Sequence, residues 1–197
     1  MVDVYLSPST QEFNIGYGSY GTEEGRMNQV ADVVEYELER HGVSVERNSP
    51  SMSLREAVEQ SNAVNPRLHV ALHSNAGDGL SRGAEVYTHR FGGTGEELAD
   101  NLYEELQMIS PTEGLGVKES APLFGGQGFY EMRYTRAPAA LVEVAFHDNP
   151  ADAQYIISNI YQIGSAVAKG ILDTLEIPYQ QDTAENVTFL KNKYNNV

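Results

Sequence analysis

Apolar residues recur along the chain with two spacings, one typical of helices and the other typical of strands. The clearest helical stripe lies between Thr22 and Gly42, where apolar positions return every three or four residues. Its members are Met27, Val30, Ala31, Val34 and Leu38. The same spacing predicts helices over residues 53–64 and 95–109, and a long helical region over residues 149–175.

Short runs of β-prone residues alternate with these helices. They predict strands over residues 2–6, 43–45, 68–72, 84–89, 130–134 and 139–146. Residues 111–128 are rich in Gly and Pro and predict a loop, while residues 178–197 are polar, as in a tail or a linker stub. Strands that alternate with helices predict an α/β fold, in which helices cover both faces of a mostly parallel sheet.

Composition and charge narrow the possible partners. The chain has 197 residues, 41% of them hydrophobic, and a formal net charge of -15. This charge repels nucleic acid and anionic membranes, so we expect neither as a main partner, and no apolar run is long enough to enter a bilayer. The start MVDVYLSPS has no basic or apolar segment of a signal peptide, so we expect synthesis in the cytoplasm and another route of release.

Cysteine is absent from the sequence. Disulfides, Cys-ligated zinc and thiol nucleophiles are therefore excluded, and a metal site would have to use His, Asp, Glu or weaker oxygen ligands.

Polar residues stand at three strand ends, where an α/β sheet places its ligands. They are the segment Ser7–Glu12 after the first strand, His73 after the run LHVAL, and Glu143 inside the run AALVEVAF. Burying a carboxylate in such a run is costly unless the group is paired, protonated or bound to a metal. An edge strand that turns Glu143 to solvent is the alternative, but Leu141 and Ala145 would share that face, which favours a functional role.

The other candidates are ambiguous from the residues alone. His73 fits a metal ligand or an ordinary satisfied histidine equally well, and His69, on the same face, fits a core residue better than a supporting one. His147 could polarise a substrate carbonyl or cap the turn that follows it. Glu23 and Glu24 suit the dipole of a helix N-terminus, so a metal role for either depends on the other candidates.

Four segments together resemble a known family. They are VYLSPSTQE, GTEEGRMNQVADVVEYELERHG, LHVALHSNAG and RAPAALVEVAFHDNPADA. The chain is similar in them to the zinc-dependent N-acetylmuramoyl-L-alanine amidases of the amidase-3 type, which include autolysins, spore-lytic enzymes and phage endolysins. The resemblance extends over about residues 2–175, and the last two segments are its most specific part.

The resemblance implies a twisted six-stranded sheet and one zinc ion held by His, Glu and His. Carried over, His73 is the later His ligand and Glu143 is the catalytic general base. Glu23 matches the acidic ligand by its distance of eight residues from Ala31, and Glu24 is the alternative.

The first zinc ligand departs from the family pattern. The family has a His in a D-P-G-H-G-G loop, and the matching stretch here, residues 7–13, has none. An ungapped match places Thr10 in the His slot, followed by Gln11 and Glu12, and a carboxylate is the best zinc ligand of the three. This departure implies weaker zinc binding, a harder metal or a pseudoenzyme.

The resulting hypothesis is a metal-dependent hydrolase that cleaves the amide between N-acetylmuramic acid and L-alanine in peptidoglycan. Asn75, Lys118, Arg133 and His147 are candidate substrate contacts. Residues 1–177 would be the catalytic domain, 178–197 the tail, and a separate domain could bind the cell wall. The alternatives are a peptidoglycan-binding pseudoenzyme of the same fold and a metallocarboxypeptidase.

Overall fold

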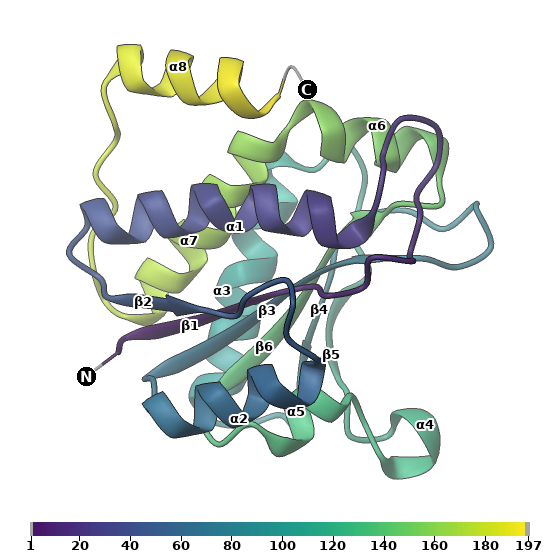
Figure 1. Cartoon of the computed structure of the whole chain (residues 1–197), viewed down its shortest axis with the longest axis vertical. Coiled ribbons are helices and arrows are strands. Elements are labelled where there is room, and N and C mark those ends of the chain that lie inside the picture. Colours follow the sequence, from purple (N-terminus) through teal and green to yellow (C-terminus); the bar gives the residue numbers. More distant parts are fainter. Residues whose placement is uncertain (1, 196–197) are drawn as a thin grey trace.

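A six-stranded sheet lies between two layers of helices in the computed structural model, which describes residues 2–195 (Figure 1). The strand order is β2-β1-β3-β6-β4-β5, and neighbours run parallel except for β4 and β6. The strands are β1 (Val4–Pro8), β2 (Val45–Arg47), β3 (Leu68–Asn75), β4 (Glu85–Thr88), β5 (Gly116–Glu119) and β6 (Ala139–Phe146). The mostly parallel α/β fold expected from the sequence is therefore confirmed.

The two layers of helices differ in size. One face of the sheet carries α1 (Glu23–Arg40), α3 (Thr94–Ile109), α6 (Pro150–Ser158) and α7 (Ile160–Thr174), and the other carries α2 (Leu54–Val64) and α5 (Tyr130–Tyr134) (Figure 1). A single turn, α4 (Leu123–Gly126), precedes α5, and α8 (Ala184–Tyr194) ends the described chain. The main hydrophobic core lies under α1, α3 and α7, and a small cluster around Ala71, Met132 and Leu141 lies on the opposite face.

Strand alternation decides which residues face the smaller layer. In β3, Val70 and Leu72 join the main core, so the residues between them point to the opposite face. In β6, Val142 does the same, and its neighbour Glu143 faces the α2 and α5 side. The two central strands therefore direct their polar side chains away from the large core and towards α5.

Three segments differ from the expectations. The strand predicted over 130–134 is wrong, because these residues form the helical turn α5, whose Met132 packs under the sheet. The predicted loop 111–128 contains the edge strand β5, which pairs with β4. The helical region 149–175 is divided at Asn159 into α6 and α7.

The segment expected to be a polar tail contains helix α8. Thr183 caps this helix by accepting a hydrogen bond from the backbone N–H of Asn186, and Leu190 and Tyr194 are buried in the main core. The segment expected to be a polar tail or linker stub therefore includes a packed helix at residues 184–194. Polar composition concealed the helix because few of its side chains reach the core.

None of the helices within residues 2–195 is long and apolar enough to cross a membrane.

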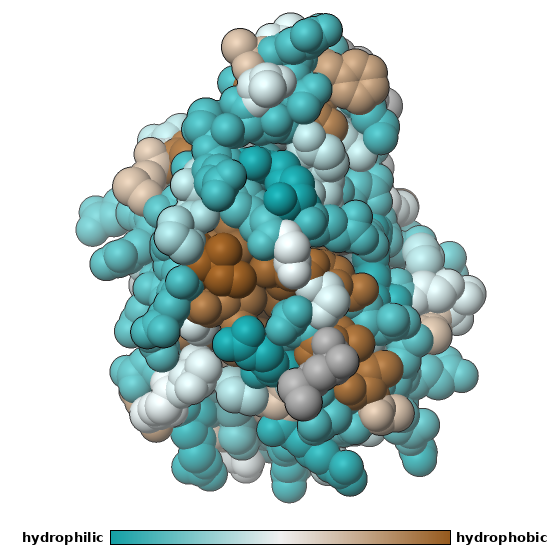
Figure 2. Space-filling model, turned by 90° about the vertical axis from the view of Figure 1, so that its left-hand side faces the viewer, coloured by the Kyte–Doolittle hydropathy of each residue, from teal (hydrophilic) through white to brown (hydrophobic). Residues whose placement is uncertain are grey.

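On the face of the molecule at the amino ends of the parallel strands, hydrophobic residues gather in the middle and hydrophilic residues surround them (Figure 2). His73 and Glu143 lie towards the other end of these strands.

Candidate active site

Two neighbouring strands and one helix bring the candidate residues together. His73 of β3 and Glu143 of β6 are directly paired in the parallel ladder, so their side chains stand next to each other on one face. Glu23 is the first residue of α1, which begins after the Thr22 cap. The backbone thus places all three at the carboxyl edge of the sheet, where sequence reasoning expected them.

Glu23, not Glu24, is the acidic residue at His73. The His73 Nδ1–H donates to Glu23 Oε1 at 2.7 Å, and Asn14 Nδ2 donates to the other carboxylate oxygen at 2.5 Å. Glu23 is fully buried. Burial raises the pKa of Glu23, but the hydrogen bond and positive charge of His73, together with Asn14 and Ser9, lower it below its ordinary range. The carboxylate therefore stays ionised.

Glu131 of α5 is a site residue that sequence reasoning missed. Its Oε1 accepts a hydrogen bond from His69 Nε2 at 2.9 Å, and its Oε2 lies 3.9 Å from His73 Nε2. Burial raises the pKa of Glu131, but hydrogen bonds and charges from both histidines lower it to about 2. The segment was expected to be a strand, and no motif singled the residue out, so only the packing of α5 under the sheet reveals it.

His73 lies between two carboxylates as a result. Burial lowers the pKa of His73, but Glu131 and Glu23 together raise it well above its ordinary value. His69 is fully buried and also meets Ser61, whose Oγ lies 2.9 Å from His69 Nδ1. His69 is therefore both a core residue, as expected, and a partner of the site.

The carboxyl group of Glu143 has a buried oxygen that accepts no hydrogen bond from residues 2–195. Its Oε2 is buried, and none of the described residues donates to it. Burial raises the pKa of Glu143 to about 8; the charge of His73 opposes this rise, and Glu23 and Glu85 add to it. A carboxyl group that titrates near neutral pH can accept and return a proton.

Lys118 and Asn75 converge beside Glu143. Glu85 of β4 stands opposite Glu143 across the antiparallel ladder. It accepts a hydrogen bond from Asn75 Nδ2 at 3.1 Å and forms an ion pair with Lys118, whose side chain is 45% exposed. These two candidate substrate contacts therefore lie next to the site with a half-exposed ammonium group at its edge.

The remaining candidate substrate contacts, His147 and Arg133, differ in their relation to the site. His147 is buried, and its ring nitrogens meet Ser74 Oγ at 2.8 Å and Asn14 Oδ1 at 3.2 Å. Arg133 is exposed, hydrogen-bonds Gln127 and lines a hollow at the far end of β6. His147 is thus linked to Glu23 through Asn14, which bonds both, whereas the hydrogen bond of Arg133 leads to Gln127.

The loop in the position of the family's first His ligand also borders the site. Thr10 and Gln11 line a cavity of about 90 Å³ together with Ser9, His73 and Glu131. Glu12 is exposed and is not part of this lining. The identity of a first ligand among Thr10, Gln11 and Glu12 stays a prediction.

The donor chemistry of the site fits a zinc ion at the His73–Glu23 pair. Zinc in proteins takes His nitrogen and carboxylate oxygen, and this pair presents one of each. The unpartnered Glu143 oxygen beside them is free to meet a polar group that the chain does not supply. Within residues 2–195, however, no group of three or more His, Cys, Asp or Glu side chains is arranged to hold a metal ion.

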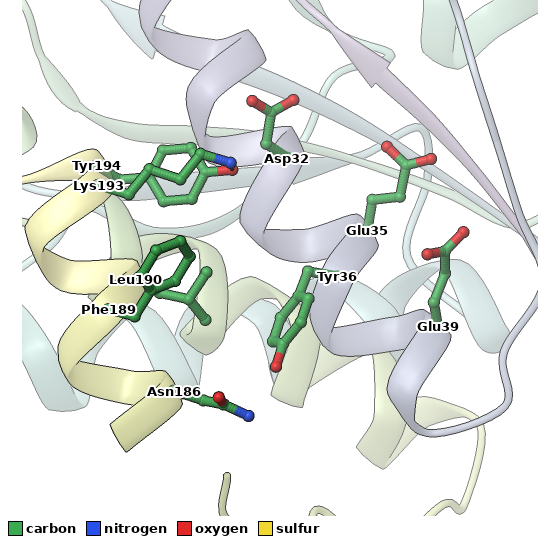
Figure 3. A pocket seen from close by; sticks show the side chains of 9 residues that line it. All are labelled: Asp32, Glu35, Tyr36, Glu39, Asn186, Phe189, Leu190, Lys193 and Tyr194. Carbon is green, nitrogen blue, oxygen red and sulfur yellow. Dashed lines mark hydrogen bonds between the residues drawn. The ribbon is translucent and has the colours of Figure 1, made fainter. Parts of the chain in front are cut away.

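A larger hollow lies far from these residues. It measures about 600 Å³ and is formed by side chains of α1 and α8, with Asp32, Glu35 and Glu39 on α1 and Phe189 on α8 (Figure 3). Asp32 and Glu35 both pair with Arg47, at 2.8 and 3.4 Å. The residues that line this hollow are not among the site residues named above.

Comparison with known proteins agrees with this geometry. Glu143, whose pKa burial raises to about 8, stands beside the His73–Glu23 pair at the edge of the sheet where α/β proteins bind ligands. The model of the amidase-3 family, N-acetylmuramoyl-L-alanine amidase, matches residues 12–173. The chain therefore belongs to the amidase-3 family.

Two proteins of Bacillus subtilis are similar to this chain in sequence. The chain is 28% identical to the N-acetylmuramoyl-L-alanine amidase LytC of Bacillus subtilis over 172 residues, which are 84% of this chain and 33% of LytC. It is also 30% identical over 132 residues to the uncharacterised protein YqiI of the same bacterium, covering 66% of this chain and 60% of YqiI. The chain thus spans about a third of LytC and 60% of YqiI.

Solved structures share the fold. The amidase AmiC2 of Nostoc punctiforme aligns with a TM-score of 0.76 and 25% identity, over 89% of this chain and 97% of that one. The catalytic domain of the amidase CwlV from Bacillus (Paenibacillus) polymyxa aligns with a TM-score of 0.79 and 19% identity, over 90% of this chain and 100% of that one.

Proposed function

We propose that this chain is a metal-dependent peptidoglycan hydrolase that cleaves the amide bond between N-acetylmuramic acid and the L-alanine of the stem peptide. The observation that carries the proposal is the pairing of Glu143 with His73 and Glu23 at one sheet edge. Membership of the amidase-3 family supports the choice of substrate.

Glu143 would perform the proton transfers. In its ionised form it would accept a proton from the attacking water as the oxygen forms a bond to the lactyl carbonyl carbon. It would then pass that proton to the leaving nitrogen of L-alanine as the amide C–N bond breaks. Its pKa of about 8 suits both steps, because a group that titrates near the working pH exchanges protons with little cost in either direction.

His73 and Glu23 would hold zinc. When bound, zinc polarises a scissile carbonyl and lowers the pKa of a water molecule. The contribution of the chain is to fix the two donors: Asn14 holds the second oxygen of Glu23, and the Thr22 cap starts α1 at the right place.

Lys118 and Asn75 would help to place the substrate. Lys118 is half exposed beside Glu143, so its ammonium group can meet a stem-peptide carboxylate without leaving Glu85. Attachment to the wall would come from another domain or from substrate recognition alone, because a net charge of -15 gives this chain no attraction to an anionic polymer.

The products of peptidoglycan digestion test the proposal. Purified peptidoglycan is incubated with the zinc-supplemented protein, and the soluble products are identified by mass spectrometry and by labelling of new amino termini. We expect L-alanine as the new amino terminus and glycan strands that keep the lactyl carboxylate. Release of a terminal amino acid would instead indicate a carboxypeptidase.

Two variants make the test specific. Glu143→Gln should lower the rate by about 100-fold to 10,000-fold, the usual contribution of a general acid–base group. Glu59→Gln, which alters an exposed carboxylate of α2, should leave the rate unchanged. Wall binding with no products from any of the three proteins would favour the pseudoenzyme, which the missing first His ligand also favours.

A further inference from the structure

The buried pair His69–Glu131 takes no part in the proton transfers described above, yet it lies against the site. We propose that Glu131, anchored by His69, is a positioning residue that holds the imidazole of His73 from its Nε2 side and keeps Nδ1 turned towards Glu23. The inference rests on the proposed function for its catalytic consequence, but the orientation of the ring can be tested without it.

Three elements build the anchor. Glu131 comes from α5, His69 from β3 and Ser61 from α2. Ser61 Oγ meets His69 Nδ1 at 2.9 Å, and His69 Nε2 meets Glu131 Oε1 at 2.9 Å. All three residues are buried, and the His69 ring also stacks on Tyr5 at 5.3 Å between centroids. One carboxylate oxygen is thus fixed, which directs the other towards His73.

The two edges of the His73 ring then face two different carboxylates. Nδ1 donates to Glu23 at 2.7 Å, while Nε2 lies 3.9 Å from Glu131 Oε2. A separation of 3.9 Å exceeds a direct hydrogen bond. The cavity of about 90 Å³ that both side chains line is large enough for a water molecule to bridge them. With its ring held at both edges, His73 has one orientation in which Nδ1 meets Glu23.

Core packing alone does not require these polar groups. Replacing a buried charged pair with apolar side chains of similar size is often neutral or stabilising, whereas removing one partner is strongly destabilising. The neighbours Ala71, Met132 and Leu141 are apolar and could accept such a replacement. A double apolar variant therefore separates folding from positioning.

The test compares the unmodified chain with His69→Phe/Glu131→Leu and with the matched surface control Glu59→Gln. Thermal unfolding first checks the fold. Nuclear Overhauser contacts from the His73 ring protons, recorded on the metal-free proteins, then report ring orientation. We expect a single orientation in the unmodified chain and in the control, and more than one orientation in the folded double variant.

Zinc affinity and kinetics supply the functional readout. Residues that hold a metal-bound His in place usually contribute about 10–100-fold to metal affinity or activity, so the double variant should lose zinc affinity or kcat in that range with little change in KM. A folded double variant whose His73 ring keeps one orientation would overturn the inference. If the unmodified chain neither binds zinc nor hydrolyses peptidoglycan, the proposed function fails, and ring orientation still decides the role of Glu131.

Discussion

Glu143 imposes a free-energy cost on the folded chain. Burial raises its pKa from 4.5 to about 8, so the folded protein binds this proton more tightly than the unfolded chain does. Between these two values the unfolded state gives up the proton first, and the free energy of unfolding therefore falls as pH rises. A group kept for packing alone would not carry this cost, which favours a functional reason for its presence.

Replacing this carboxyl should therefore stabilise the metal-free protein, and only at high pH. We expect Glu143→Gln to match the unmodified chain near pH 5, where Glu143 is protonated in the folded state. Above pH 8 the variant should be more stable by a few kcal/mol, since each pKa unit corresponds to about 1.4 kcal/mol. Urea unfolding with a chelator present measures the free energy of unfolding of both proteins at each pH. An equal difference in stability at the two pH values would contradict the raised pKa of Glu143.

The neighbouring acids at the start of α1 should behave differently. Glu23 bonds His73 and Asn14, whereas Glu24 is partly exposed, one position further along the helix. We expect Glu23→Gln to lower zinc affinity by more than the roughly 10–100-fold typical of residues that only hold a metal ligand in place. Glu24→Gln should bind zinc as the unmodified chain does. Competition with a chromophoric chelator measures the zinc affinity of both variants. Equal losses of affinity would contradict the conclusion that Glu23, and not Glu24, is the acidic residue at the zinc site.

Among the elements, α7 depends on close approach to its neighbours. A Cβ atom added at Gly170 would lie 2.8 Å from Leu102 Cα and 2.9 Å from Asn101 O, both in the backbone of α3. Gly usually weakens a helix by up to about 1 kcal/mol relative to Ala, so its presence here reflects packing and not helix propensity. The two helices touch backbone to backbone at this point.

Gly170→Ala should therefore destabilise the fold even though it improves helix propensity. We expect a loss of about 1–3 kcal/mol in the free energy of unfolding, the usual cost of overpacking. Asp173→Ala on the exposed side of the same helix is the control and should change stability by less than about 0.5 kcal/mol. Stabilisation by Gly170→Ala in urea unfolding would mean that α3 and α7 lie further apart.

Elements with a long or strongly apolar pattern were predictable from the sequence, and short or polar ones were not. The stripe of α1 and the apolar run of β6 each carry enough periodic positions to define their type. By contrast, α5 is a single turn of five residues, and α8 buries only Leu190 and Tyr194 among its mostly polar residues. Tertiary packing stabilises these two elements, and the local pattern of apolar and polar residues does not reveal that packing.

At the scale of the whole molecule, the site joins segments that are far apart in the chain. His73 and Glu143 could be predicted because each stands at the end of, or inside, an apolar strand. Glu23 followed from its place in a family motif. Glu131 could not be predicted, because its contact with His69 spans 62 residues and depends on how α5 packs beneath β3. The sheet alone places His73 and Glu143, whereas α1 of the larger helical layer adds Glu23 and α5 of the smaller layer adds Glu131.

Metal content measured together with hydrolysis tests the central claim most directly. The protein is purified, analysed for bound elements, and assayed for the release of L-alanine amino groups from peptidoglycan before chelation, after chelation and after zinc is returned. The account predicts about one zinc per chain, loss of L-alanine release on chelation and recovery when zinc is returned. The Glu143→Gln variant should release few amino groups under all of these conditions. Protein that holds no zinc and releases no amino groups, even with zinc added, would contradict it.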